Sequence, residues 1–411
     1  MTHHAGCHGI RRGARGVDLG RDINRRGGRR AGQEPGSLTG STRHGVRRGG
    51  SACLHCDVKY AASDAVAPND ALFEYKSMKA MPCLEQAEQI NVRWPRFGEL
   101  ARQMAAVRAA DVERCLAEQR SGGGLLGERL IAQGLLTAAD ADEIVARQAQ
   151  WVARSLRAEF DGPGFPRPET LSLCLPAFNE QDNIVATLRS ARAILPHYVG
   201  GFEVVVVDDG SRDETAKRVA AVAQSDPRVR LIRHNRNQGY GAAVTSGLRA
   251  ATGDLVMFAD SDGQFNFLDV AHLLVQLRDS DLVVGYRRNR AEGWRRRLNA
   301  WAWGRLVGAV LDVRVRDLDC AFKLFRRELV ERLHMTSAGA CINAEIMAQC
   351  VHGGLRFHEV PVSHYARHAG AATGARLKVI ARAFGELPAL RKYRHQQLPP
   401  AGPRPPRARA A

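Results

Sequence analysis

The sequence predicts an α/β fold, with a mostly parallel sheet flanked by helices and a small all-α repeat domain ahead of it. From residue 170 onward, short apolar runs alternate with helical patterns, which is typical of βαβ units. Acidic residues directly follow several of these runs, most clearly in Leu255–Gln264, which reads LVMFADSDGQ. Residues 92–150 contain two similar stretches, which start at Phe97 and Leu126. A repeat of this size usually marks one helical unit packed on its copy.

The composition bounds the class of protein. With 411 residues, of which 45% are hydrophobic, the chain is long enough for two or more domains with real cores. The net charge of +17 favours polyanionic partners, such as phosphorylated substrates, anionic membranes or nucleic acid. Nine scattered cysteines without a signal peptide indicate a reduced, cytoplasmic setting. No apolar run approaches the roughly 18 residues that span a bilayer, so membrane contact is expected to be peripheral.

Residues 1–77 are rich in Arg and Gly, have no apolar periodicity, and are expected to be disordered. An alternative is that translation begins at Met78 or Met81. Binding of nucleic acid by this segment is not favoured, because the aromatic residues used by single-strand binders are missing. Cys53 and Cys56 lack a second ligand pair at zinc-finger spacing, so zinc is not favoured either.

The repeat at residues 92–150 predicts two short helices per copy, with a hinge at Ser121–Gly124 between the copies. The second copy resembles the N-terminal domain of type II secretion ATPases. Some members of that family bind cyclic di-GMP through paired motifs that start Arg-Leu-Gly and carry a central Gly. Each copy here departs from the motif, because the first has Ala105 at the central position and the second has Leu125 in place of Arg. A cyclic dinucleotide site and a plain helical docking module both remain open.

Residues 151–169 include a Pro- and Gly-dense stretch and are expected to link this domain to an α/β domain at residues 170–370. Apolar runs predict strands, and intervening patterns predict helices, one of which starts near Ser211 with capping-box spacing to Glu214. The expected strands are Leu171–Leu175, Phe202–Val207, Val229–Arg233, Leu255–Ala259, Leu282–Tyr286 and, at an edge that tolerates a proline, His358–Val362.

Polar residues follow three of these strands where each one ends. The first strand ends in Pro176–Glu180, the second in Asp208 and Asp209, and the fourth in Asp260 and Asp262. The carboxyl ends of parallel strands meet at one edge of the sheet, where such folds bind ligands. Two carboxylates one residue apart can hold a hard cation that in turn holds a diphosphate. Gly239 and Gly241, at the start of a helix, are expected to let a phosphate approach free backbone N–H groups.

Residues 170–370 resemble a family 2 glycosyltransferase of the GT-A fold, in the branch of dolichyl-phosphate mannosyltransferases and bacterial polyprenyl-phosphate glycosyltransferases. The segments that carry the resemblance are LPAFNE, VVVVDDGSRDET, NRNQGYGAAVTSG, ADSDGQ, DLDCAFKLFRRE and HEVPVSHYARHAG. The resemblance implies a nucleotide-diphospho-sugar transferase. One departure follows Gln264, where Phe265-Asn266-Phe267 replaces the polar residues and proline of the family, so the wall of the sugar pocket is expected to differ.

The resemblance also implies roles for single residues. Base and ribose of the donor would lie against Pro176, Ala177, Phe178, Glu180, Asp208 and Asp209. Mg²⁺ or Mn²⁺ would be held by Asp260, Asp262 and Gln264. Arg287 and Arg367 would meet donor or acceptor phosphates, Glu345 would lie near the sugar, and Asp319 would be an acid on the acceptor side. Asp260, Asp262, Asp319 and Arg367 are therefore the candidate catalytic residues.

The acceptor half of the chain is basic and rich in tryptophan. Arg295–Arg297 lie among Trp294, Trp301 and Trp303, a combination that suits an anionic membrane surface but also a solvated basic helix with core tryptophans. Residues 371–395 are expected to form an amphipathic cationic helix, either on a membrane or docked on the catalytic domain. Residues 396–411 are expected to be disordered.

Together these patterns predict an inverting transferase that moves a hexose from a nucleotide-diphosphate sugar to a polyprenyl phosphate, at the inner face of the cell membrane. GDP-mannose and UDP-glucose both fit as donors. One alternative is transfer to a hydroxyl of a cell-wall or capsular glycan. Another is a nucleotide-sensing regulatory protein whose transferase domain only binds its donor. The intact Glu180, Asp209, Asp260, Asp262 and Gln264 argue against an inactive domain.

Overall fold

A computed structural model describes residues 95–122, 124–159, 167–278, 280–288, 294–367, 384–394 and 398. Side chains at 121–122, 158–159, 167–168 and 294–300 lie outside this description. The expectations for residues 1–77, for Trp294 and Arg295–Arg297, and for residues 371–383 therefore concern parts of the chain that are not described. Within the described residues, no helix is long and apolar enough to cross a membrane.

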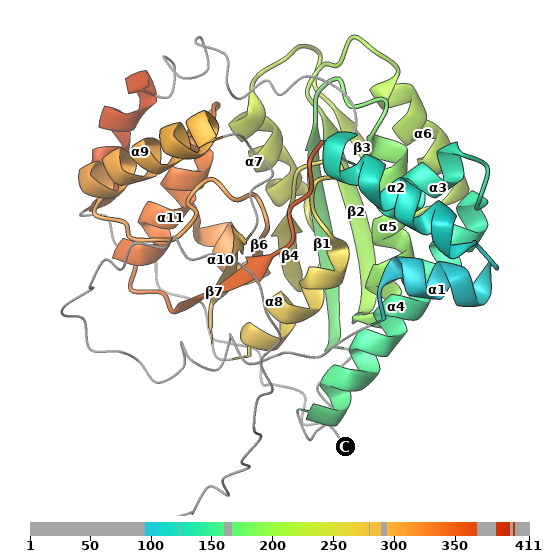
Figure 1. Ribbon diagram of the computed structural model, residues 1–411. Helices are drawn as coiled ribbons and strands as arrows, with labels where there is room; N and C mark the ends of the chain where they lie inside the picture. Colours follow the sequence, from blue (N-terminus) through green and yellow to red (C-terminus); the bar gives the residue numbers. More distant parts are fainter. Residues whose placement is uncertain are drawn as a thin grey trace, which may run out of the picture. The chain divides into compact units, whose positions relative to one another are not determined.

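The centre of the molecule is a seven-stranded sheet in the order β3-β2-β1-β4-β6-β5-β7 (Figure 1). All neighbouring strands pair in parallel except β6, which is antiparallel to both β4 and β5. The strands are β1 Arg167–Ala177, β2 Val199–Asp208, β3 Val229–Arg233, β4 Leu255–Phe258, β5 Leu282–Arg287, β6 Lys323–Arg326 and β7 Phe357–Val362. The predicted fold class, a mostly parallel sheet flanked by helices, is confirmed.

Unalternating apolar runs form the middle of the sheet because both of its faces are covered. All four residues of β4 are buried, and so are Val204–Val207 of β2. The expected strand at residues 358–362 is the edge strand β7, where Pro361 is tolerated. Six strands thus lie where the apolar pattern placed them.

The seventh strand, β6, was not expected, and it lies inside the sheet between β4 and β5. Its first residue, Lys323, is fully buried. The Lys323 ammonium donates to the carbonyls of Leu318 and Cys320 and, at 2.8 Å, to Oδ1 of Asn343. Burial lowers the pKa of Lys323, and these oxygens offset part of the cost of desolvating the amine.

Helices cover both faces of the sheet (Figure 1). Among them, α7 packs across β1, β2 and β4, while α6 packs on β2 and β3. The helix expected from Ser211 begins only at Thr215, because the Ser211 hydroxyl accepts a hydrogen bond from the backbone N–H of Asn179 instead. The helical segments that follow β1 are α5 Ile184–Ile194, η1 Leu195–His197, α6 Thr215–Ser225, α7 Tyr240–Ala250, η2 Phe267–Asp269, α8 Val270–Gln276, α9 Trp294–Leu311, α10 Arg327–Arg332, α11 Ile342–His352 and η3 Leu387–Arg394.

Four further helices precede the sheet: α1 Phe97–Met104, α2 Ala109–Gly122, α3 Leu126–Ala132 and α4 Ala138–Glu159. They enclose a small core of their own that includes Leu100, Cys115, Leu130 and Ile144. The helices that begin the two copies of the repeat, α1 and α3, pack on each other. A Cβ on Gly127 of α3 would lie 2.9 Å from the ring of Phe97 in α1. Glycine at this position therefore permits close packing of α3 on α1.

The four-helix segment is joined to the α/β domain by packing and by charge. Helix α4 continues to Glu159, into the expected linker, and its buried residues Val152 and Leu156 belong to the main core. Arg189 of α5 pairs with Glu128 of α3 and, at 2.8 Å, with Asp142 of α4. This segment therefore docks on its own chain. A cyclic dinucleotide at the repeat stays a prediction.

The described C-terminal residues also pack on the α/β domain. Leu387, Leu390 and Tyr393 of η3 are buried against α9 and α11, and Leu398 lies in the same core. The apolar stripe expected for a membrane-bound helix therefore faces the protein at residues 387–393. Packing at Leu398 likewise differs from the disorder expected beyond residue 395.

Candidate active site

The site lies at the point where the strand order changes direction. From β1 the chain steps outward to β2 and β3 and then returns to place β4 on the other side of β1. The carboxyl end of β4 lies beside the last part of β1, since Cys174 pairs with Phe258 and its carbonyl accepts from the N–H of Ala259. A crevice at such a switch point is where open α/β sheets bind their ligands.

The turn after β1 is held by hydrogen bonds to the turn after β2. The backbone N–H of Glu180 donates to the Thr215 hydroxyl at 2.8 Å, and that of Arg212 donates to Oδ1 of Asn179 at 2.9 Å. Asn179 has a φ of 55°, a left-handed conformation that asparagine tolerates better than most residues. This conformation lets the turn double back, and the buried Glu180 carboxylate takes a hydrogen bond from Asn183 Nδ2 at 2.8 Å.

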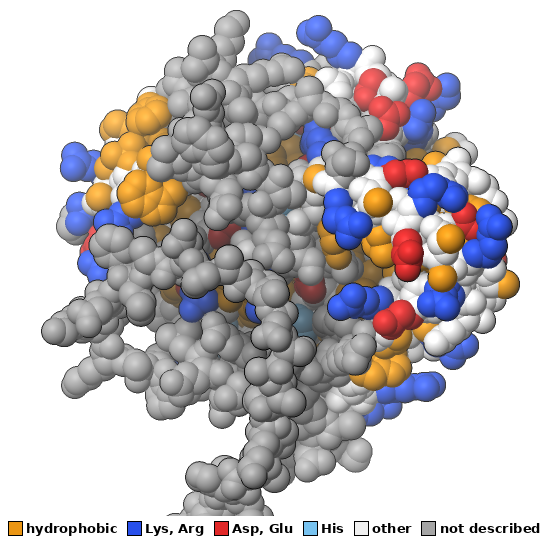
Figure 2. Space-filling view, in the orientation of Figure 1, with side chains coloured by type: hydrophobic (Ala, Val, Ile, Leu, Met, Phe, Trp, Pro, Cys, Tyr) orange, Lys and Arg blue, Asp and Glu red, His pale blue; other side chains and the backbone are white. Residues whose placement is uncertain are grey.

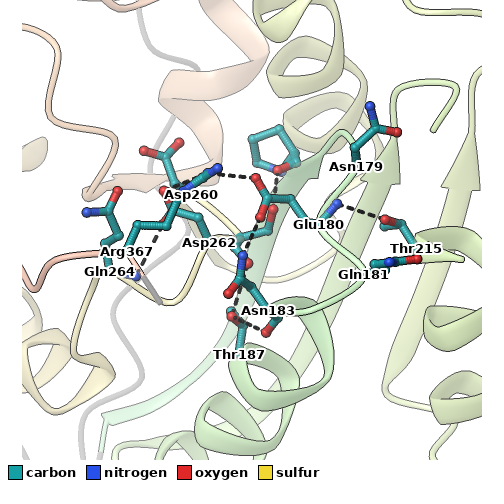
Figure 3. A network of polar contacts seen from close by, with 12 residues as sticks. Asn179, Glu180, Gln181, Asn183, Thr187, Thr215, Asp260, Asp262, Gln264 and Arg367 are labelled. Carbon is teal, nitrogen blue, oxygen red and sulfur yellow. Dashed lines mark hydrogen bonds and ion pairs between the residues drawn. The ribbon is translucent and has the colours of Figure 1, made fainter. Parts of the chain in front are cut away.

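The acids after β4 face this turn (Figure 3). Asp260 Oδ1 accepts from the Tyr240 hydroxyl at 3.0 Å, and Asp262 is 7% exposed. Burial, reinforced by the charge of Asp262, raises the pKa of Asp260 to about 6 from 3.8. Burial likewise raises the pKa of Glu180. The site thus concentrates negative charge where it is poorly solvated, which is favourable only beside a cation.

Arg367 supplies positive charge to this cluster. One guanidinium nitrogen lies 2.7 Å from Glu180 Oε1 and 3.1 Å from Asp262 Oδ2, so it bridges the turns after β1 and β4 (Figure 3). Gln264 lies beside it and donates through Nε2 to the carbonyl of Tyr365 at 2.7 Å. The predicted residues Glu180, Asp262, Gln264 and Arg367, from opposite halves of the domain, therefore lie together.

A pocket of about 540 Å³ opens beside the β1 turn. Phe178 forms one wall, as expected for a residue that meets the base of a nucleotide. The other lining residues are Gly210, Ser211, Arg212, Arg233, His234, Asn235, Arg236 and Asn237. Its size suits a nucleoside. Several of these residues, Arg212, Asn235, Arg236 and Asn237, lie in segments that carry the family resemblance, but the sequence analysis assigned them no role.

The two acids after β2 support the walls of this pocket. Asp209 accepts from the backbone N–H groups of Gln238 and Gly239 and lies 2.7 Å from Nδ1 of His234. Asp208 is fully buried, and its Oδ2 lies 3.2 Å from Nε of Arg233. Asp209 therefore shapes the loop after β3 with the oxygens that were expected to hold base or ribose.

The glycine-rich start of α7 needs a correction. Its N–H groups were expected to meet a phosphate, but Gly239 donates to Asp209, and Gly241 donates to the carbonyl of Ala338 at 2.9 Å. A Cβ on Gly241 would lie 2.2 Å from the carbonyl oxygen of Ser337. These glycines thus admit another part of the same chain rather than a ligand.

The structure shows the surroundings of three further predicted residues, Glu345, Arg287 and Asp319, whose roles toward donor and acceptor stay predictions. Glu345 is fully buried and accepts from the N–H and hydroxyl of Thr336, from the N–H of Ser337, and from the Tyr393 hydroxyl at 2.7 Å. It therefore anchors the loop that caps α7. Arg287 makes two hydrogen bonds, 2.7 and 2.8 Å long, to the carboxylate of Asp317. Asp319 is half-buried in the loop that precedes β6.

The site can hold a divalent cation. Asp260, Asp262 and the amide of Gln264 form a hard oxygen donor set, and the pKa of Asp260 is raised by its burial and by the neighbouring charge of Asp262. No cluster of three His, Cys, Asp or Glu ligands occurs among the residues that the structure describes. Such a cation would therefore complete its coordination with water and donor oxygens, as Mg²⁺ does with nucleotide phosphates.

The fold and the site define an α/β domain with an acidic site at the switch point of its sheet. Residues 172–333 match the family Glycosyl transferase family 2.

Among curated relatives, the dodecaprenyl-phosphate galacturonate synthase of Rhizobium johnstonii is 29% identical over 204 residues, 49% of this chain and 60% of that protein. The undecaprenyl-phosphate 4-deoxy-4-formamido-L-arabinose transferase of Sodalis glossinidius is 27% identical over 217 residues, 52% of this chain and 65% of that protein. The chain thus spans about three fifths of the length of these relatives. A solved glucosyl-3-phosphoglycerate synthase from Mycobacterium tuberculosis superposes with a TM-score of 0.44 and 22% identity, over 61% of this chain and 83% of that one.

Proposed function

We propose that the protein transfers a hexose from a nucleotide-diphosphate sugar to a polyprenyl phosphate, with inversion at the anomeric carbon. The observation that carries this proposal is the meeting of Glu180, Asp260, Asp262 and Arg367 beside a nucleoside-sized pocket. The curated relatives named above are both transferases that use polyprenyl phosphates, which favours a lipid phosphate as acceptor.

The donor would lie with its base in the pocket beside Phe178 and its diphosphate toward the acids after β4. Mg²⁺ or Mn²⁺ at Asp260, Asp262 and Gln264 would neutralise the leaving diphosphate. Arg367 already lies at these acids and carries a charge that can pair with a phosphate oxygen. The protein would thus orient the donor beside the turns after β1 and β2, which are hydrogen-bonded to each other.

The acceptor would need little activation. A phosphate monoester is already anionic at neutral pH, so its oxygen can attack the anomeric carbon without a general base. If the acceptor were instead a hydroxyl of a glycan, a carboxylate would have to take its proton, and half-buried Asp319 is the candidate. Transfer to a glycan would be recognised by its glycosylated product. A purely nucleotide-sensing role would be recognised by nucleotide binding without any transfer product.

A donor panel tests the proposal. We expect purified protein with Mn²⁺ and a short-chain polyprenyl phosphate to form a sugar-phosphate lipid from one of GDP-mannose, UDP-glucose and UDP-galacturonate, detected by product mass. Omitting Mn²⁺ and adding a chelator should stop product formation. Transfer to a glycan hydroxyl, or nucleotide binding without transfer to any acceptor, would contradict the proposed function.

We also propose that α9 and η3 rest on an anionic membrane surface. Trp301 is 63% exposed and Phe384 is 51% exposed. Figure 2 shows hydrophobic side chains gathered over α9. Exposed cationic side chains occur on the same two elements, which pack on each other: Arg305, Arg391, Lys392 and Arg394. Large exposed aromatics beside cationic residues suit a membrane–water interface, and α9 would bring the domain to its lipid substrate.

Vesicle binding tests this surface. The double variant Trp301→Ala, Phe384→Ala should bind vesicles that contain phosphatidylglycerol at least about tenfold more weakly than wild type, because two apolar side chains no longer leave water. Val185→Ala is the matched control, since Val185 is 39% exposed on α5. Equal binding of both variants to the anionic vesicles would refute the role of the patch. Wild-type protein that bound neutral phosphatidylcholine vesicles as tightly as anionic ones would refute it too.

A further inference from the structure

Arg367 comes to the site on a short segment, Ser363–Arg367, that we name the strap. On one side the strap is bonded to the turn after β4. The N–H of Tyr365 donates to the carbonyl of Gln264 at 2.8 Å, and Gln264 Nε2 returns a hydrogen bond to the carbonyl of Tyr365. The N–H of Ser363 donates to the buried carboxylate of Asp269 at 2.6 Å. These hydrogen bonds hold the strap in place from Ser363 to Tyr365.

The next residue of the strap is held from the four-helix segment. The carbonyl of Ala366 accepts a hydrogen bond, 2.8 Å long, from the backbone N–H of Gly124. Gly124 lies in the turn between α2 and α3, more than two hundred residues earlier in the chain. After β7 the chain runs past the ends of the central strands toward α2 (Figure 1). The bond thus attaches the helical segment one residue before the arginine that bridges Glu180 and Asp262.

Gly124 is itself fixed within the helical segment. Its carbonyl accepts from Nε2 of Gln119 in α2 at 2.7 Å, and its φ of 81° is a conformation that side chains rarely adopt. Gly124 thus has its carbonyl bonded to α2 and its N–H bonded to the strap. Gln119, Gly124 and Ala366 form a continuous path from a helix of the N-terminal segment to the strap.

A second connection leads to the other side of the site. Helix α5 begins three residues after the Glu180–Gln181 turn, and Arg189 of α5 pairs with both Glu128 and Asp142 of the helical segment. The helical segment thus contacts the strap, which carries Arg367, and α5, which follows the turn that carries its partner Glu180. A rigid connection to each would keep the guanidinium between the two carboxylates.

We infer that the turn between α2 and α3 positions Arg367 for the donor, with Gln119 and Gly124 as positioning residues. The helical segment then contributes to sugar transfer, and any movement of α2 relative to α3 would change the position of Arg367 at the donor site. This inference rests on the proposed function only in taking Arg367 as a residue that meets the donor. Its structural content can be measured without turnover.

Hydrogen exchange of the intact protein tests the inference directly. Gln119→Ala removes the donor that holds the Gly124 carbonyl, so the amides of Gly124 and Tyr365 should exchange at least about tenfold faster than in wild type. Gln133→Ala is the matched control. Gln133 is an exposed glutamine of the same segment that bonds Arg114 and Glu118 instead. Its variant should leave both amides unchanged.

Kinetics give the second readout. In Gln119→Ala, kcat/KM for the donor should fall about tenfold, mainly through KM, while the melting temperature stays near that of wild type. Gln119→Lys, which keeps a donor at similar reach, should restore part of the loss. If Gln119→Ala folds poorly, Gln119→Glu, which keeps the size and loses the amide donor, replaces it.

Unchanged exchange of Gly124 and Tyr365 in a folded Gln119 variant would overturn the inference, and so would the same acceleration in Gln133→Ala. Wild-type protein that transfers no sugar to a polyprenyl phosphate would contradict the proposed function alone. The exchange of these amides would still decide whether the helical segment holds the strap.

Discussion

Asp260→Asn should lower kcat/KM for sugar transfer by at least about a thousandfold, since it removes one of two carboxylates that would hold the cation, and metal stabilisation of a leaving group contributes several kcal/mol. The fold should survive, because an asparagine oxygen can still accept from the Tyr240 hydroxyl. The measurement is a rate assay with Mn²⁺ alongside Mn²⁺ binding by calorimetry.

The stability of this variant carries separate information. The folded protein raises the pKa of Asp260 to about 6 from 3.8, so at neutral pH the ionised side chain lowers the free energy of unfolding. Asparagine removes that penalty, and the variant should be as stable as wild type or more so without metal. The control is Asp182→Asn, which should keep activity. The Asp182 side chain lies just after the turn that follows β1 and is 54% exposed. Wild-type turnover by Asp260→Asn would refute the metal role.

Arg367→Ala should lower kcat/KM for the donor by about a hundredfold or more, because a charge that faces the diphosphate is lost. Removal of the guanidinium also leaves Glu180 and Asp262, both largely buried, without their shared cation. An unpaired buried charge is strongly destabilising, so the melting temperature should fall in the absence of metal.

Mn²⁺ provides the decisive comparison for this variant. Since Arg367 and a divalent cation both neutralise Asp262, Mn²⁺ should raise the melting temperature of Arg367→Ala more than that of wild type. It should also bind the variant at least as tightly. Arg120→Ala, at an exposed arginine of α2, should change neither quantity. Weaker Mn²⁺ binding by Arg367→Ala would show that the arginine supports the metal site rather than competing with it.

The sequence predicted the core of this site because its signals are local. Buried strands read as apolar runs, and the residues just past their ends must share one edge of a parallel sheet. For this reason Glu180, Asp260 and Asp262 could be placed together before any coordinates. The partner of the acids, Arg367, came from resemblance to a family and not from any local pattern.

The errors involve contacts between distant parts of the chain. Strand β6 begins with Lys323, and a lysine within a short apolar stretch suggests exposure. Only the oxygens of Leu318, Cys320 and Asn343 make its burial possible. Glycines at the start of α7 indicated a ligand, but the loop that fills this space lies about a hundred residues later. A spacing of glycines cannot distinguish a phosphate from a backbone carbonyl, since both accept from N–H groups.

The position of β6 has a consequence for how the chain can be divided. Because β6 is inserted between β4 and β5 but follows both in the chain, the nucleotide-binding half has a gap in its sheet until residue 326 is present. A fragment that ended at Arg288 would expose the edge of the apolar strand β4 and the edge of the apolar start of β5, the kind of surface that pairs between molecules. Such a fragment should aggregate on expression, so truncation cannot separate donor binding from acceptor binding. A soluble fragment must include β6.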